Sequence, residues 1–222
     1  RKEPARRVRL MIVGQENVGK SSISHALRTG TPSTVNISTD GIYVSPWSVD
    51  LPSGATIQTE IWDFAGQEIY YSTHRLFLSD QAIYLIVWNI MDPEEDTKLQ
   101  YWLESIKLMS HGAPTILVAT HIDQELKEKA HVTLHKLASK FHQRFPFIKA
   151  ITAVSCLTCA GFPELQERLI ELMAGQAFLE AQVPSKYQFF ERQIHFERTQ
   201  RRPPVMTLPE YTELASLFAI PA

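Results

Sequence analysis

The sequence predicts an α/β fold in which a mostly parallel, six-stranded sheet carries helices on both of its faces. Short apolar runs of β type alternate along the chain with helical stretches of about ten or more residues, as in sheets whose parallel strands are joined by crossover helices. Two further strand-like segments, residues 41–49 and 55–62, are separated by the turn formers Pro52, Ser53 and Gly54. This hairpin predicts one antiparallel strand at an edge of the sheet.

The expected elements follow one another in a regular order. Strands are expected over residues 8–13, 41–49, 55–62, 82–88, 115–119 and 147–154. Helices are expected over residues 19–28, 93–109, 124–144 and 163–173. Pro93 suits the first turn of the second helix, because proline has no backbone N–H and an N–H in the first turn has no partner inside the helix. Residues 29–40 are rich in Gly, Pro, Ser, Thr and Asn, which predicts a loop.

The composition excludes several classes of protein. Lys plus Arg number 22 and Asp plus Glu 24 in 222 residues, so the net charge of −2 argues against a general nucleic-acid or membrane-surface binder. The longest apolar stretch, residues 82–88, is too short for a transmembrane segment of about 20 residues. Two cysteines exclude a disulfide scaffold and fit a reducing compartment, so we expect a cytoplasmic protein.

Four segments are expected along the chain: an upstream linker over 1–7, a main domain over 8–175, a linker over 176–184 and a partial region over 185–222. The last holds two helix candidates, residues 187–202 and 208–218, the second with Thr207 as its possible N-cap. Because the chain begins at Arg1 within a basic stretch, and not at Met, we expect it to be a piece of a longer protein.

The strongest motif is GQENVGKS at residues 14–21, which fits G-x-x-x-x-G-K-[ST] between a predicted strand and a predicted helix. Glycines let backbone N–H groups converge on a phosphate, Lys20 can reach the β and γ oxygens, and the Ser21 hydroxyl can ligate Mg²⁺. A chance glycine turn is the alternative, and the position between strand and helix argues against it.

A second motif, Asp63-Phe64-Ala65-Gly66, ends the predicted strand 55–62 and is followed by Gln67. An acid there can hold Mg²⁺ through water, the Gly66 amide can bind a γ-phosphate, and Gln67 can orient an attacking water. Thr39 precedes the strand 41–49, where its hydroxyl could complete the Mg²⁺ coordination. A plain loop threonine remains the alternative at this position.

The choice of base depends on the stretch Thr120-His121-Ile122-Asp123, which follows the strand 115–119. The Asp123 carboxylate could accept hydrogen bonds from N1 and N2 of guanine, a donor pair that adenine lacks. Equally, Asp123 could cap the helix expected from residue 124. Ser155 and Cys156 follow the strand 147–154, where a backbone amide could meet the guanine carbonyl.

The order of these motifs over residues 8–174 resembles a Ras-like P-loop GTPase domain. Three details resemble the Roc domain of the Roco family: STDGI at 38–42, WDFAGQE at 62–68 followed by YYSTH at 70–74, and THID at 120–123. The stretch 183–214 is similar to the opening of a COR region, although it is less specific than the other motifs.

The resemblance implies a role for each matching residue. It implies that the phosphates are contacted by Gly14, Glu16, Asn17, Val18, Gly19, Lys20, Ser21 and Ser22, and that Gly66 contacts the γ-phosphate. It implies that Mg²⁺ is bound by Ser21, Thr39 and Asp63, and that Gln67 and Lys20 take part in catalysis. It implies that guanine is bound by Thr120, His121 and Asp123, and that Ser155, Cys156 and Leu157 close over the base. Many Roco proteins lack a glutamine at the position of Gln67, so its presence does not prove that it is catalytic.

We therefore expect a switch domain of a larger signalling protein that binds GTP and GDP with Mg²⁺ and hydrolyses GTP slowly. The resemblance implies flanking domains (the remainder of COR, and leucine-rich repeats and a kinase in some members) and is compatible with a homodimer. A nucleotide-gated interaction and dimerisation module with negligible hydrolysis is the alternative. A kinase or ATPase that uses ATP is more distant, because the stretch 120–123 favours guanine.

Overall fold

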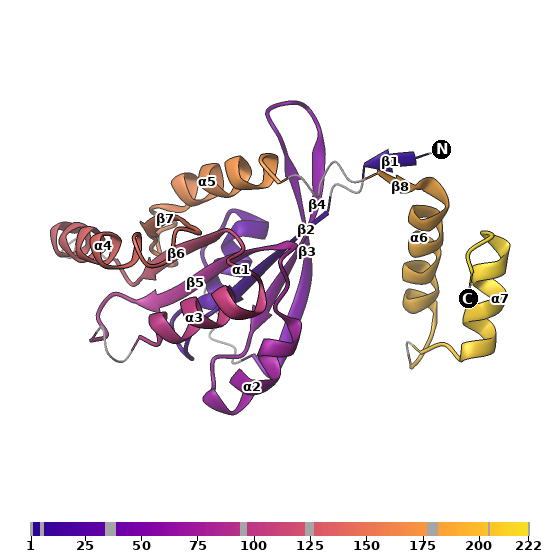
Figure 1. Cartoon of the computed structure of the whole chain (residues 1–222), viewed down its shortest axis with the longest axis horizontal. Helices are drawn as coiled ribbons and strands as arrows, with labels where there is room; N and C mark the ends of the chain where they lie inside the picture. The colour runs from indigo at the N-terminus through magenta and orange to yellow at the C-terminus, as the bar shows by residue number, and fades with distance from the viewer. Residues whose placement is uncertain are drawn as a thin grey trace. The chain divides into compact units, whose positions relative to one another are not determined.

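The computed structural model describes residues 2–4, 7–33, 39–93, 97–122, 127–176, 182–203 and 205–221. The chain divides into two compact units, which Figure 1 shows. The larger spans residues 7–176, and the smaller combines residues 1–6 with residues 177–222.

The described part of the larger unit contains one six-stranded sheet in the order β3-β4-β2-β5-β6-β7. β3 pairs antiparallel with β4 at one edge, and the other neighbouring strands are parallel. The predicted fold class is therefore confirmed. The strands are β2 (Arg7–Val13), β3 (Ile42–Asp50), β4 (Thr56–Phe64), β5 (Ala82–Asn89), β6 (Thr115–Thr120) and β7 (Ile148–Ala153).

Helices connect the strands of this sheet (Figure 1). Their bounds are α1 (Lys20–Thr29), η1 (Glu68–Tyr70), α2 (Tyr71–His74), η2 (Arg75–Phe77), α3 (Leu99–Met109), α4 (Lys127–Phe141) and α5 (Phe162–Ala174). No helix in the described ranges of the chain is both long and apolar enough to cross a membrane.

The prediction that a helix begins in the turn at Pro93 is wrong, because α3 begins at Leu99. Asn89 closes a turn after β5: its side chain accepts from the N–H of Met91 and donates to Asp92. Lys98, directly before the helix, has φ 52° in the left-handed region. The chain thus turns at residues 89–92, before Pro93, and the helix starts after Lys98.

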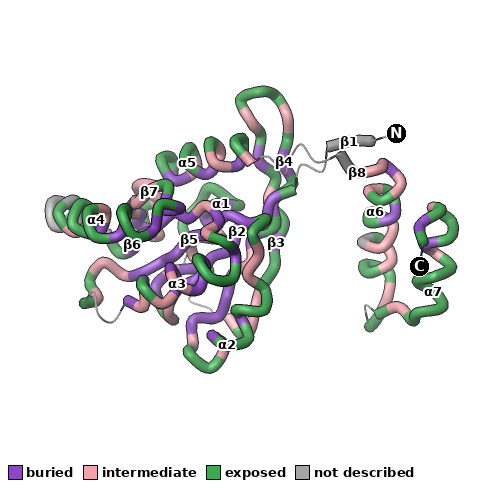
Figure 2. The backbone as a smooth tube through the Cα atoms, in the orientation of Figure 1, coloured by how far each residue is buried: buried purple, intermediate pink, exposed green. Residues whose placement is uncertain are grey.

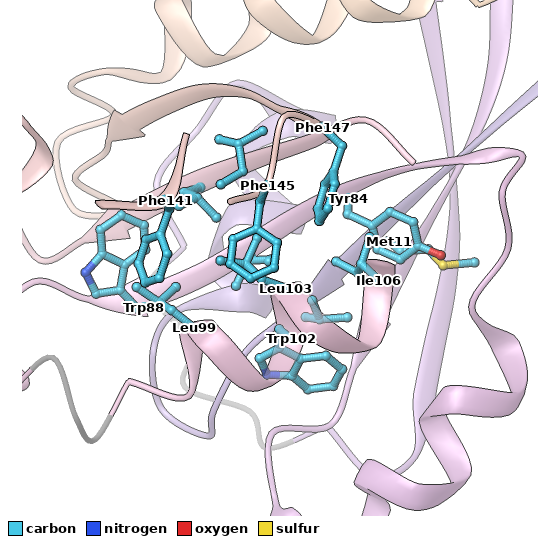
Figure 3. Close-up of a cluster of buried hydrophobic side chains, with 14 of the residues drawn as sticks. Met11, Tyr84, Trp88, Leu99, Trp102, Leu103, Ile106, Phe141, Phe145 and Phe147 are labelled. Atoms are coloured by element: carbon cyan, nitrogen blue, oxygen red, sulfur yellow. The ribbon is translucent and has the colours of Figure 1, made fainter. Parts of the chain in front are cut away.

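A large aromatic cluster fills the space between the sheet and helices α3 and α4 (Figure 3). Tyr84 and Trp88 come from β5, Trp102 from α3, and Phe141 and Phe145 from the end of α4 and the turn after it. Truncating a buried aromatic of this kind to alanine costs roughly 3–5 kcal/mol. The cluster therefore fixes α3 against the strands whose carboxyl ends carry the predicted site.

The opposite face of the sheet is covered by α1 and α5, which contact each other. α1 buries Ile23 and Leu27, and α5 buries Leu165 and Leu169. These residues recur at helical spacing, which places one apolar stripe of each helix against the sheet. The packing holds α1 rigidly, so its first turn, which follows the glycine-rich loop, is held in place as well.

The smaller unit contains β1 (Lys2–Pro4), β8 (Gln182–Pro184), α6 (Ser185–Gln200) and α7 (Leu208–Leu217). β1 and β8 pair antiparallel, although the sequence predicted linkers there. Thr207 caps α7 through reciprocal hydrogen bonds with Glu210, which confirms the predicted cap. Both helices are largely exposed (Figure 2), and Phe190, Ala215 and Ile220 form a small core.

Candidate nucleotide-binding site

The glycine-rich loop joins the end of β2 to the start of α1 and turns sharply at Gly14. Gly14 has φ 147°, and a Cβ there would lie 2.2 Å from the carbonyl oxygen of Val87, so only glycine fits. Gly19 occupies the N-cap of α1 at φ 90°, and no side chain caps the helix. The first N–H groups of α1 thus lack a side-chain cap, and such groups at a helix N-terminus favour a phosphate.

Lys20 is the buried cation of this loop. Only 5% of the residue is exposed, and Nζ donates a hydrogen bond to the carbonyl oxygen of Gln15. Burial lowers the pKa of Lys20 to about 8, and the charges of Asp63 and Glu16 oppose that change. A phosphate next to Nζ would favour the charged form of Lys20 and raise this pKa.

Three oxygen-bearing side chains from three segments converge beside Lys20. Ser21 Oγ donates to Asp63 Oδ2 at 2.6 Å, and Thr39 Oγ1 donates to the same oxygen at 3.1 Å. The hydroxyl oxygens of Ser21 and Thr39 lie 2.9 Å apart. The structure therefore brings together the three residues that the sequence analysis placed at Mg²⁺.

The Asp63 carboxyl group carries a further sign of an ion site. Burial raises the pKa of this group, while hydrogen bonds from Ser21 and Thr39 and the charge of Lys20 act in the opposite direction. Its second oxygen, Oδ1, is buried and has no hydrogen-bond partner within the described ranges. Carboxylate and hydroxyl oxygens are ligands that Mg²⁺ accepts, so these residues fit the ion.

Gly66 lies directly against the phosphate loop. A Cβ at this position would be 2.2 Å from the backbone nitrogen of Glu16 and 2.3 Å from its Cα, which excludes any other residue. Gln67 follows, partly buried, and its carbonyl oxygen accepts from the N–H of Tyr70 at 3.1 Å. The Asp63–Gly66 motif and the phosphate loop thus form one contiguous site.

The segment after Gln67 is anchored by aromatic side chains to which the sequence analysis gave no structural role. Tyr71 stacks on Tyr101 of α3 with ring centroids 5.2 Å apart. His74 is buried edge-on against Phe64 at 4.8 Å, and this burial lowers the pKa of His74. Nothing in the sequence of this segment separated the buried rings from the exposed ones.

Arg75, the nearest arginine to this segment in sequence, is directed toward α3. Its guanidinium lies 5.0 Å from the centre of the Tyr101 ring, a cation–π distance. Glu68 forms an ion pair of 3.1 Å with Lys98 just before α3. These contacts tie the segment 68–77 to α3 in this conformation.

Thr120, at the end of β6, connects the expected base-binding stretch to the phosphate loop. Its buried hydroxyl lies 2.8 Å from the carbonyl oxygen of Val18 and 3.0 Å from that of Trp88. His121 Nδ1 lies 2.9 Å from the same hydroxyl. Which of the two groups donates depends on the tautomer of the His121 ring. Asp123 lies outside the described residues, and its role stays a prediction.

The third stretch, residues 155–157, approaches the same loop. Ser155 is buried, and its Oγ accepts from the N–H of Thr158 at 3.2 Å. A Cβ at Gly19 would lie 3.6 Å from Cys156 Sγ, so this thiol borders the phosphate loop. Burial raises the pKa of Cys156 to about 11. Leu157 is 71% exposed at the surface.

A separate cavity of about 540 Å³ lies between α4, β7 and the start of α5. Its walls are largely aliphatic, with Leu134 and Ala138 from α4 and Ile151 from β7. Among the described residues that the sequence analysis assigned to the nucleotide, none lines this cavity, although Ile122 of the stretch 120–123 does. The phosphate loop, and not this cavity, therefore carries the predicted chemistry.

Comparison with known proteins places this arrangement in a family. The family model described as "Ras of Complex, Roc, domain of DAPkinase" matches residues 9–123. The probable serine/threonine-protein kinase pats1 of Dictyostelium discoideum is 34% identical over 98% of this chain, which spans 7% of that protein. The probable serine/threonine-protein kinase roco5 of the same organism is 32% identical over the whole chain, which spans 10% of it.

A solved structure shares the fold. The Roco2 RocCORdC protein of Methanosarcina barkeri, bound to GDP, superposes with a TM-score of 0.77 and 21% sequence identity. The match covers 98% of this chain and 63% of that one. At this level of identity the likeness supports the architecture, and the chain spans only a small part of its curated relatives.

Proposed function

The chain belongs to the Roc family, and from that premise we propose that it is a GTP-binding and slowly GTP-hydrolysing switch domain of a larger Roco-type signalling protein. The convergence of Ser21, Thr39 and Asp63 beside Lys20 is the observation that carries this proposal. It supplies oxygen ligands for a divalent cation next to a buried lysine at the start of a helix without a side-chain cap.

The proposed reaction is the attack of water on the γ-phosphorus of GTP, which breaks the bond to the β–γ bridging oxygen and gives GDP and phosphate. Lys20 would bind the β and γ oxygens, and the Gly66 amide would bind the γ-phosphate. Gln67 follows Gly66 and would orient the water. Mg²⁺, held through Ser21, Thr39 and Asp63, would supply positive charge to the phosphates.

The proposed base contacts lie at the ends of β6 and β7. Asp123 would accept hydrogen bonds from guanine, next to His121, whose ring is oriented by the Thr120 hydroxyl. Residues 155–157 would close over the base, and the contact between Cys156 and the phosphate loop supports their proximity.

The position of Arg75 supports slow hydrolysis. Arg75 stacks on Tyr101, so in this conformation it is not directed at the phosphate loop. Arginine supplied to the transition state is worth about 10³–10⁵ in rate in related enzymes. The same observation favours the second candidate, a nucleotide-gated interaction and dimerisation module with negligible hydrolysis. Flanking COR, leucine-rich-repeat and kinase regions belong to the proposal for the whole protein.

Single-turnover hydrolysis of GTP separates the two candidates. We expect a rate on the order of 10⁻³ s⁻¹ or below for the whole chain. The variant Gln67→Leu should slow it further and leave GTP affinity unchanged. A rate indistinguishable from that of GTP in buffer would favour the interaction module, and a failure to bind GTP would reject both candidates.

A further inference from the structure

The two cysteines of the chain, Cys156 and Cys159, lie in the loop between β7 and α5. A hydrogen bond closes this loop on itself, because the N–H of Ser155 donates to the carbonyl oxygen of Ala160 at 2.9 Å. The cysteines stand just inside this closure, and residues 156–158 form a turn. The first and last residues of a four-residue turn have Cα atoms within about 7 Å of each other, which is the limit for a disulfide.

Both thiols are free and partly exposed in the structure. Over the described ranges of the chain, no three His, Cys, Asp or Glu side chains are grouped closely enough to hold a metal ion. A metal site that uses the pair is therefore not indicated. Disulfides of exposed cysteine pairs are the ones that form and break readily.

Cys156 is also the point at which this loop meets the phosphate loop. A Cβ at Gly19 would lie 3.6 Å from Cys156 Sγ and 3.6 Å from Thr120 Cγ2. Gly19 is the N-cap of α1, and Lys20 begins that helix. The sulfur atom that a disulfide would use therefore borders the backbone that the proposed function assigns to the phosphates.

We propose that Cys156 and Cys159 are a redox-modification site, at which a reversible disulfide within the chain weakens nucleotide binding while it is closed. The inference rests on the proposed function, in which residues 155–157 close over the base. A disulfide holds its two sulfurs about 2 Å apart, so Cys156 Sγ and Cys159 Sγ have to approach each other. The contact with the phosphate loop and the position of Leu157, which stands between the two cysteines, then change together.

Thiol–disulfide exchange with a small disulfide such as glutathione disulfide supplies the oxidant. Burial raises the pKa of Cys156 to about 11, so the first attack falls to the thiolate of Cys159. Cys159 displaces one glutathione thiolate and forms a mixed disulfide. Cys156 Sγ then attacks Cys159 Sγ and displaces the second glutathione thiolate. Each departing thiolate takes up a proton that one cysteine has lost, so one glutathione disulfide yields two glutathiones per bond formed.

The redox state and the nucleotide affect each other by the same factor. If the closed disulfide weakens GDP binding, bound GDP must disfavour closure to an equal extent, because the two equilibria are linked. GDP would therefore protect the dithiol, and an oxidising shift would release the nucleotide.

Two measurements on the whole chain test the proposal. The first is the dissociation constant of GDP for protein reduced with dithiothreitol and for protein equilibrated with glutathione disulfide. Mass spectrometry counts the hydrogens lost and any glutathione bound, and non-reducing electrophoresis detects bonds between chains. The second is the midpoint of oxidation in glutathione buffers, with and without saturating GDP. Cys159→Ser is the matched control, because it leaves Cys156 in place and cannot form the bond.

We expect oxidised wild type to lose two hydrogens without a glutathione adduct and to bind GDP about fivefold or more weakly, with recovery in dithiothreitol. Reduced Cys159→Ser should bind GDP within about twofold of reduced wild type, since no contact of Cys159 with the phosphate loop is proposed. Saturating GDP should move the wild-type midpoint toward more oxidising buffers by the factor found in the affinities.

Wild type that forms only glutathione adducts or bonds between chains overturns the proposal. Equal GDP affinity of the reduced protein and the protein with the closed disulfide also overturns it, as does a midpoint that GDP does not move. Should Cys159→Ser fail to fold, the wild-type midpoint decides alone. Wild type that binds GDP in neither redox state rejects the proposed function itself, and the hydrogens lost still show separately whether the disulfide forms.

Discussion

Ser21 and Asp63 are joined by a hydrogen bond of 2.6 Å although they stand 42 positions apart in the chain. One belongs to the first turn of α1 and the other to the end of β4. β2, which precedes the phosphate loop, pairs in parallel with β4, so the carboxyl ends of both strands meet at one edge of the sheet. The parallel pairing is what brings the two motifs into one site.

The first prediction concerns this hydrogen bond. Ser21→Ala should weaken GDP binding in the presence of Mg²⁺ by about tenfold or more, and much less in EDTA, because the hydroxyl acts through the ion. Ser24→Ala, on the same helix, is the control: the Ser24 hydroxyl is buried and has no hydrogen-bond partner in the described part of the chain. Equal losses with and without Mg²⁺ would contradict a role at the ion.

A second prediction follows from the pKa of Lys20, which is lowered to about 8 by burial. A bound phosphate raises this pKa. Binding is therefore accompanied by proton uptake at any pH at which Lys20 of the free protein is deprotonated. GDP affinity should be constant below pH 8 and fall by up to about tenfold per pH unit above it.

Calorimetric titrations from pH 7 upward in buffers of different ionisation enthalpy would measure both the affinity and the proton uptake. Lys20→Gln is the control for this series, because any pH dependence of GDP affinity that remains in this variant arises from titration of the nucleotide. A wild-type profile that parallels the Lys20→Gln profile would show that Lys20 does not titrate on binding.

The third prediction concerns Thr120. Thr120→Val removes the hydroxyl that serves the carbonyls of Val18 and Trp88, which should cost roughly 1–3 kcal/mol of unfolding free energy. Thr120→Ser keeps the hydroxyl and should retain most of that stability. Denaturant unfolding without nucleotide measures both variants. If Thr120→Val proves no less stable than Thr120→Ser, the hydroxyl contributes no more to stability than the methyl group that serine lacks, which would contradict this role.

The fourth prediction concerns the segments that contact the γ-phosphate in the proposed function. Amide exchange over residues 29–40 and 66–74 should slow when the non-hydrolysable GTP analogue replaces GDP, because Thr39 and Gly66 gain a partner. Residues 115–119 of β6 are buried and should not change. Identical exchange in both states would indicate that the nucleotide is a structural ligand.

Much of this fold could be predicted because its signals are local. The buried strand 82–88 and the helix that follows the phosphate loop are set by apolar periodicity and by one continuous motif. Asp63 then meets Ser21 because β2 and β4 are parallel, and Thr39 joins them because the start of antiparallel β3 pairs with the end of β4. Each of these inferences needs only the order of the elements along the chain.

Features that depend on distant partners could not be predicted. Pairing of β1 with β8 joins residues about 180 positions apart, and three-residue strands leave no periodic signal. The start of α3 at Leu99 depends on the backbone at Lys98, which adopts the left-handed conformation without a glycine. The direction of the Thr120 hydroxyl, toward Val18, is likewise invisible in a four-residue motif.

The central claim, a site for guanine nucleotides, is tested most directly by competition between GDP, ADP and xanthosine diphosphate. Wild type should prefer GDP to both by at least about 100-fold. Asp123→Asn should weaken GDP by roughly 2–3 kcal/mol and favour xanthosine diphosphate, because the amide complements a base with a carbonyl at that edge. Equal affinity of wild type for GDP and ADP would contradict the account.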